Sequence, residues 1–151
     1  MSESTVSQDS APTASGGGSS ENRSAASLRR LLMVELLFIL VEFVSGVYMV
    51  VAGVNTVGVG IHGAFGALAG LLGIVILIYA VRSPWLRVGS QCTLGLVFLV
   101  VAGLGGLLYL RGVDPAEAYL ALMAVGFILS GAFYSMPLSR LRRQASNPTG
   151  G

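Results

Sequence analysis

The chain has 151 residues, of which 54% are hydrophobic and only 11% are charged, and its formal net charge is +2. Soluble domains carry about 25% charged residues, and disordered chains combine low hydrophobicity with high charge, so neither class fits the chain as a whole. The small net charge does not indicate a nucleic-acid partner. A single Cys and a single His exclude an intrachain disulfide, a cysteine-based metal cluster and a two-histidine zinc site. The composition predicts an integral membrane protein.

Residues 1–27 form a polar N-terminal segment that contains nine Ser and the triplet Gly16-Gly17-Gly18. Such a segment cannot bury enough apolar surface to offset the entropy lost on ordering, which predicts a disordered tail. The basic pair Arg29-Arg30 follows the tail instead of opening it, so the segment does not have the order of a signal peptide.

Four long apolar runs follow, at residues 31–54, 57–81, 88–110 and 116–137. Each is close to the ~20 residues that a helix needs to cross ~30 Å of hydrocarbon. The links between them are short, and short links make consecutive helices antiparallel neighbours. The sequence predicts an all-α, up-down-up-down four-helix membrane bundle over residues 28–143, followed by a short tail at 144–151.

The Arg residues are distributed unevenly between the two ends of this bundle. One end holds eight of the nine basic residues, all of them Arg: Arg23, Arg29, Arg30, Arg82, Arg87, Arg140, Arg142 and Arg143. The other end holds Arg111 beside Asp114 and Glu117. Since basic loops stay in the cytoplasm, the pattern predicts a multi-pass protein of the cell (inner or plasma) membrane with both termini cytoplasmic. Tyr134 is expected near the inner membrane interface.

Glycines at 63, 66, 70 and 73 line one face of the second run. The pair Gly66-x-x-x-Gly70 matches the small-residue spacing at which membrane helices approach closely. Packing inside one bundle is the favoured interpretation of Gly63, Gly66, Gly70 and Gly73. A homo-oligomer or a larger membrane complex is the alternative partner besides the lipid bilayer.

Glu35 and Glu42 lie seven residues apart in the first run, so both carboxyl groups lie on one helix face. Glu35 is about one turn inside the cytoplasmic boundary and is interpreted as an interfacial or Arg-paired carboxylate. Glu42 lies ~16 Å from Leu31 along the helix, near the bilayer midplane. An acid there costs about 2–3 kcal/mol to insert, so we expect it to be neutral or paired and regard it as the leading functional candidate.

His62 and Asn55 are the remaining candidate polar residues. His62 is expected near the outer interface, either packed with one satisfied ring nitrogen or acting as a ligand or proton relay. Helix rise places it about 10 Å above Glu42, so the two would need a water, Tyr48 or helix tilt to communicate. Asn55, at the outer turn, either bonds His62 or simply ends the helix, and the second interpretation is favoured.

Three families resemble parts of this plan. Over the first two runs, Glu42, Gly46, His62 and Gly66 resemble uncharacterised small four-helix membrane proteins of prokaryotes. The four-helix plan also resembles small b-type cytochromes, but a haem would need Met49 or a second subunit as its other ligand. A membrane-embedded Glu in the first of four helices is similar to small multidrug-resistance transporters, which lack the Ser-rich tail and have a less one-sided Arg distribution.

These observations predict a non-enzymatic accessory or interaction subunit, with no catalytic residue, metal or cofactor. Two alternatives are a proton-linked small-molecule carrier that uses Glu42, and a redox subunit associated with haem or quinone.

Overall fold

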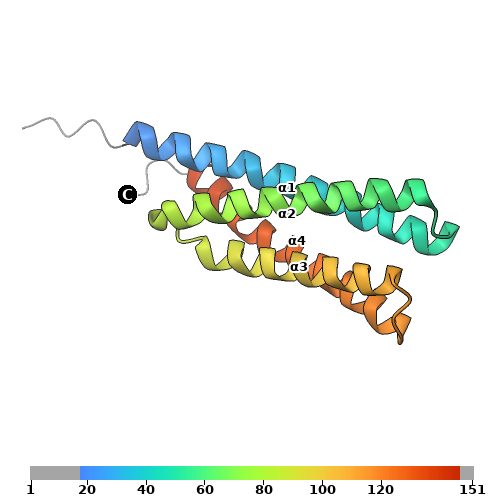
Figure 1. The fold of residues 1–151 in the computed structure, drawn as a ribbon. Helices are drawn as coiled ribbons and strands as arrows, with labels where there is room; N and C mark the ends of the chain where they lie inside the picture. The colour runs from blue at the N-terminus through green and yellow to red at the C-terminus, as the bar shows by residue number, and fades with distance from the viewer. Residues whose placement is uncertain (1–17, 147–151) are drawn as a thin grey trace, which may run out of the picture.

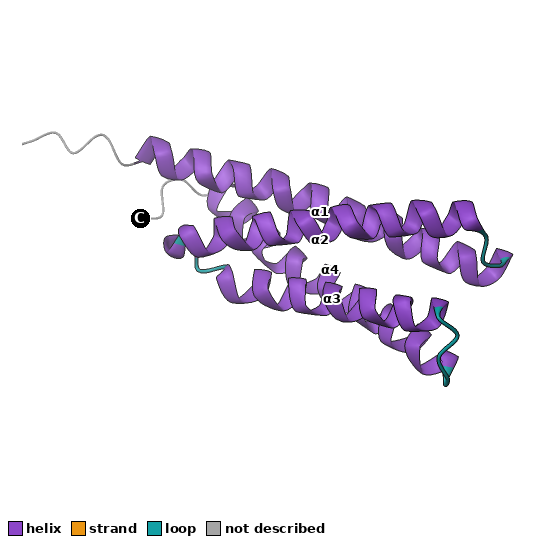
Figure 2. Ribbon diagram, viewed as in Figure 1, coloured by secondary structure: helices purple, strands orange, loops and turns teal. Residues whose placement is uncertain are grey.

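The computed structural model describes residues 18–146, and side chains from 23 to 143. Within this part of the chain the fold is all-α without strands (Figure 2). It consists of four long helices, α1 (Gly18–Ala52), α2 (Thr56–Arg82), α3 (Gly89–Leu110) and α4 (Ala116–Ser146), with one short 3-10 helix, η1 (Pro84–Leu86). All four long helices are long and apolar enough to span a membrane.

Consecutive helices run in opposite directions, so that α1 and α2 form one hairpin and α3 and α4 form another (Figure 1). The two hairpins lie side by side and separate toward the end that carries the loops at residues 53–55 and 111–115 (Figure 1). This separation positions the site described below.

The buried face of α1 follows from its residue spacing. Its buried positions alternate steps of four and three residues: Leu28, Leu32, Glu35, Ile39, Glu42, Gly46 and Met49. This heptad spacing keeps one narrow stripe of a helix against its neighbours. The carboxyl groups of Glu35 and Glu42 therefore enter the bundle because both residues occupy stripe positions. Glu35 lies between Leu32 and Ile39, and Glu42 lies between Ile39 and Gly46.

Helices α3 and α4 approach each other through small residues. A Cβ added at Gly126 would lie 2.8 Å from Ala102 Cβ and 2.9 Å from the backbone oxygen of Phe98. A Cβ at Gly105 would lie 3.0 Å from the backbone oxygen of Tyr119. Such contacts leave no space for a side chain, so glycines set the separation of these two helices.

Two predicted boundaries were wrong. Residues 18–27 were expected to be disordered, yet α1 begins at Gly18. The reason is that the stripe continues toward the N-terminus, where Ala25 packs against the core and Leu28 is fully buried. The rest of the predicted tail, residues 1–17, lies outside the described residues.

The fourth helix is also longer than the predicted run 116–137. It continues through Pro137 to Ser146, although a proline inside a helix removes one backbone hydrogen bond. Leu138 and Leu141 are buried in the core beyond the proline, and their packing supports the added turns. Of the predicted C-terminal tail, 144–146 is helical and 147–151 lies outside the described residues.

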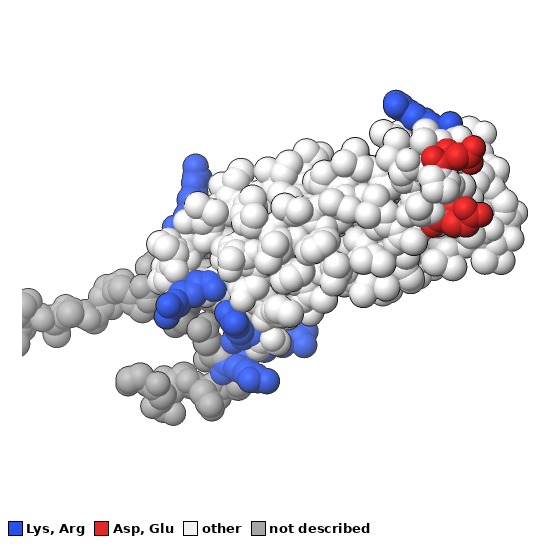
Figure 3. Space-filling view, turned by 90° about the horizontal axis from the view of Figure 1, so that it is seen from below, with Lys and Arg blue, Asp and Glu red and all other residues white. Residues whose placement is uncertain are grey.

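The exterior of the bundle is apolar between two charged ends. On the outward face of α1, Leu37, Leu40 and Val44 are each more than half exposed. Arg side chains cluster at the end where α1 begins and α4 ends, and acidic side chains with one basic group lie at the other end (Figure 1, Figure 3). An apolar surface of this extent on a soluble monomer would be a liability, whereas lipid tails would cover it.

Gly126 and Gly131 provide a matched test of the α3–α4 contact. Gly126→Ala should lower the free energy of unfolding by about 1–3 kcal/mol, because its Cβ must displace backbone atoms of α3. Gly131→Ala, five residues further along the same helix, should leave stability unchanged or slightly raised, since its Cβ meets open space. Unfolding in mixed detergent measures both, and equal losses would contradict the assigned interface.

Candidate functional site: the Glu42–His62 pair

Glu42 lies inside the bundle at the point where α1 packs against a glycine of α2. The residue is only 5% exposed, and a Cβ at Gly66 would overlap with its carboxyl group. Glycine at 66 thus provides the space that the carboxyl group occupies. One of its oxygens, Oε2, has no hydrogen-bond partner among the described residues, so the group retains an unused bonding position in the core.

His62 extends from α2 toward the same carboxyl group. Its Nε2 lies 3.9 Å from Glu42 Oε1, and both side chains are largely buried. Gly46 on α1 makes room for the imidazole, because a Cβ there would be 3.3 Å from His62 Cε1. Phe127 of α4 contacts the ring edge-on from the other side, with the two ring centroids 6.5 Å apart.

Ser45 lies between the backbone of Glu42 and the imidazole of His62. Its Oγ is 2.9 Å from the backbone carbonyl oxygen of Glu42 and 3.0 Å from His62 Nδ1. When the hydroxyl donates its one proton to the carbonyl, it accepts from Nδ1–H, and Nε2 of the neutral imidazole is then an acceptor. In this tautomer an unprotonated nitrogen faces the Glu42 carboxyl group at 3.9 Å.

The predicted separation of about 10 Å between Glu42 and His62 was wrong. Glu42 contacts Gly66, and His62 contacts Gly46. The backbone positions of Glu42 and His62 therefore differ by about one helical turn along the bundle axis. A turn is about 5.4 Å, which long side chains bridge. Tyr48, one of the three expected means of contact beside a water and helix tilt, is 61% exposed on the outside of the bundle.

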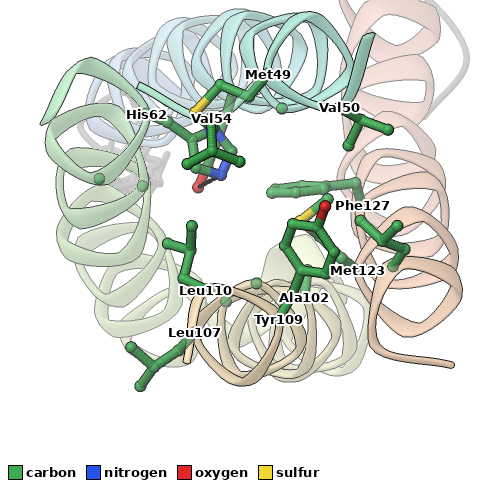
Figure 4. Close-up of a pocket in the computed structure, with 17 residues that line it drawn as sticks. Met49, Val50, Val54, His62, Ala102, Leu107, Tyr109, Leu110, Met123 and Phe127 are labelled. Atoms are coloured by element: carbon green, nitrogen blue, oxygen red, sulfur yellow. Dashed lines mark ion pairs between the residues drawn. The ribbon is translucent and has the colours of Figure 1, made fainter. Parts of the chain in front are cut away.

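The pair borders a cavity of about 250 Å³ that is lined by residues of all four helices (Figure 4). Glu42 and His62 lie at its deeper end, whereas Val54 and Leu110 lie near the inter-helix loops at the other end. The walls are mainly apolar: Met49, Val50, Ala102, Leu107, Tyr109, Leu120, Met123 and Phe127 supply the remaining side chains. Pockets of this composition hold small apolar molecules oriented by a few polar groups.

Glycines enlarge this cavity instead of closing it. Five of the residues that line it are Gly46, Gly63, Gly66, Gly103 and Gly106. Of the four glycines predicted to pack helices, Gly66 and Gly73 do contact other residues, namely Glu42 and the Glu35–Tyr134 pair. A Cβ at Gly63 or Gly70 would meet nothing within 4 Å, so these two glycines are not packing positions within the chain.

The structure places the other two candidates away from His62. Glu35 is fully buried against Gly73, about two turns below Glu42, and not paired at the interface as predicted. The reason is its stripe position on α1. Asn55 accepts a hydrogen bond from the backbone N–H of Gly58 at 2.8 Å and thereby caps α2. Its role is that of a helix terminus, which is the interpretation that the sequence favoured.

The arrangement does not fit a haem held by His62 and Met49. Met49 packs against the first turn of α2, where a Cβ at Gly58 would lie 3.2 Å from its sulfur. The thioether and the imidazole are therefore neighbours on one side of the cavity (Figure 4), whereas axial ligands must face each other. Within the described part of the chain, no group of three or more metal-binding side chains is present.

Sequence reasoning missed Ser45 and Tyr134. Ser45 is three residues after Glu42, the spacing at which a side chain reaches the same face, and that signal was available. Tyr134 was expected at the inner interface, yet it is fully buried. It lies seven residues after Phe127 and seven before Leu141, which are both buried, so heptad spacing would have placed it in the core.

Comparisons with protein-family models, with curated proteins and with solved structures found no match to this chain.

The tautomer of His62 gives a direct test of the site, because this is the only His in the chain. With the imidazole neutral, nitrogen-15 spectra should show Nδ1 protonated and Nε2 unprotonated. Ser45→Ala removes the acceptor of Nδ1–H, so both tautomers should then be populated. Ser135→Ala is the matched control, since Ser135 bonds only its own helix, at the carbonyl of Ala132. A protonated Nε2 in the unmodified protein would contradict the assigned geometry.

Proposed function

We propose that the chain is a multi-pass protein of the cell membrane that binds a small, mainly apolar cation and releases a proton from the Glu42–His62 pair in exchange. The observation that carries this proposal is a carboxyl group beside an imidazole at the deep end of an apolar cavity. The carrier alternative predicted from Glu42 is thus the function that the geometry supports best.

The proposed topology is an up-down-up-down bundle with both termini in the cytoplasm. It is supported by four helices long enough to span a membrane and by the Arg-rich end at which α1 begins and α4 ends (Figure 3). In this orientation the loops at 53–55 and 111–115 lie on the outer side. The cavity, which extends toward those loops, then faces outward in the conformation described here.

Charge balance explains why a cation would displace a proton. Neutral Glu42 with neutral His62, and ionised Glu42 with protonated His62, both carry no net charge. Burying an unbalanced charge is costly, so a cation that enters beside the Glu42 carboxylate is favoured when one proton leaves. The site then holds carboxylate, cation and neutral imidazole, again with no net charge.

The cavity walls indicate which cations fit. Phe127 and Tyr109 present aromatic rings to the cavity, and such faces attract cations. A cavity of about 250 Å³ is larger than the ~150 Å³ that accommodates benzene. We therefore propose substrates with one aromatic or branched apolar group and one positively charged nitrogen.

The accessory role and the redox role stay predictions. The haem version is disfavoured by the positions of Met49 and His62 described above. For a quinone, visible and ultraviolet spectra of the purified protein with and without a reductant provide the test.

A pair of isosteric probes tests the exchange: benzyltrimethylammonium and its uncharged carbon analogue, neopentylbenzene. The purified protein in weakly buffered detergent should bind the cation and release protons, while the neutral probe releases none. Glu42→Gln should lower cation affinity by at least about tenfold and abolish proton release, because removing one partner of a buried charge pair costs about 3–5 kcal/mol.

Gly63→Leu and Gly70→Leu are matched controls for the location of binding. Both positions face open space, but only Gly63 lines the cavity. Leu at 63 should abolish binding of both probes, and Leu at 70 should leave it intact. Binding that survives Gly63→Leu, or a cation that releases no protons from the unmodified protein, would contradict the proposal.

A further inference from the structure

A second polar cluster lies deeper in the bundle than the cavity. Glu35 and Tyr134 are both 0% exposed. Both carboxyl oxygens of Glu35 and the hydroxyl oxygen of Tyr134 lack a hydrogen-bond partner among the described residues. Leaving such groups unsatisfied in a core is unfavourable, so three unpartnered oxygens at one place indicate that the cluster binds something.

Glycines on two helices bring these oxygens together. A Cβ at Gly73 of α2 would lie 2.9 Å from the hydroxyl of Tyr134 and 3.4 Å from Glu35 Oε1. A Cβ at Gly95 of α3 would lie 3.0 Å from the Tyr134 ring. The phenol thus passes from α4 between α3 and α2 to reach the carboxyl group of α1. Three oxygens are too few for a metal ion but sufficient to hold a proton or a hydrogen-bonded water.

Buried core residues lie on both sides of the cluster: Ile39 of α1 and Ala69 of α2 lie between it and Glu42, and a second layer covers its Arg-rich side. Leu32 of α1, Ile76 of α2 and Leu138 of α4 are buried core residues beyond it. Glu42 lies one heptad away on the same stripe, about 10 Å along the helix. The titratable groups that act electrostatically on the cluster are Glu42 and, from α3, Cys92. Helix α2 contributes Gly73 at this level, and its His62 faces Glu42.

We propose that Glu35 and Tyr134 form a second proton-binding site that exchanges its proton with the cavity through Glu42. The proposal extends the proposed function, in which Glu42 takes up and releases protons. When the proton passes, the Glu42 acid becomes a carboxylate and the Glu35 carboxylate becomes an acid, so the net charge of the bundle is unchanged. The described conformation holds no hydrogen bond between Tyr134 and Glu35; in the proposed exchange the hydroxyl turns to donate to Glu35 when that group is ionised and to accept from it when it is protonated.

Infrared hydrogen–deuterium exchange of the full-length protein in lipid vesicles tests this site without any cation. Glu35→Gln and Glu42→Gln each should remove one carboxylic-acid carbonyl band and so assign the two groups. Tyr134→Phe should shift the Glu35 band alone. Glu42→Leu should slow deuteration of Glu35 by at least about tenfold, because the polar group linking it to the cavity is lost.

Glu117→Leu is the control, since it removes an exposed carboxyl group at the far end and should change neither the band nor its exchange rate. The amide bands of the same samples report whether each variant remains helical. The proposal is overturned if Glu35→Gln removes no acid band, if Tyr134→Phe leaves the Glu35 band in place, or if Glu42→Leu exchanges at the unmodified rate. Failure of cation binding would leave these results unaffected, so the two proposals can fail separately.

Discussion

The register between α1 and α2 is the constraint on which the rest of the molecule depends. Two carboxyl groups one heptad apart on α1 each lie against a glycine of α2, Glu42 at Gly66 and Glu35 at Gly73. A shift of one turn in either direction would place larger side chains, in place of these glycines, opposite the two carboxyl groups. Because α1 and α2 are antiparallel and joined by a short turn capped by Asn55, that register has little freedom to slip.

The contrast between close packing and separation accounts for the cavity. Within the α3–α4 hairpin, glycines such as Gly126 allow the backbones to touch. Between the hairpins, Gly63 and Gly103 meet no neighbour and border a space of about 250 Å³. The same residue type thus has opposite effects, depending on whether a backbone or a cavity lies opposite. Two tight hairpins that separate at one end produce a site that is deep and accessible from that end.

The sequence predicts the four helices but does not predict the distances between them. Apolar runs and short links predicted four helices with accurate inner boundaries, because hydropathy and turn residues are local properties. The early start of α1 was not predicted, because the Ser-rich composition indicated disorder. Ala25 and Leu28 nevertheless continue the buried stripe.

The candidate site was predicted in part. Glu42 and His62 could be selected as costly polar residues in apolar helices. Their proximity could not, since it depends on which residues of α1 and α2 face each other across the turn. Gly63 faces open space whereas Gly66 contacts Glu42. This difference depends on where the neighbouring helices lie, which no local pattern in α2 specifies.

The proximity of Glu42 and His62 is the central claim, and one measurement tests it most directly. Solid-state nuclear magnetic resonance of the protein in lipid bilayers can detect dipolar coupling between carboxyl carbon-13 of Glu and ring nitrogen-15 of the single His. The 3.9 Å separation of Nε2 and Oε1 predicts clear dephasing that is absent in Glu42→Gln. No dephasing in the unmodified protein, or dephasing that persists in Glu42→Gln, would contradict the account.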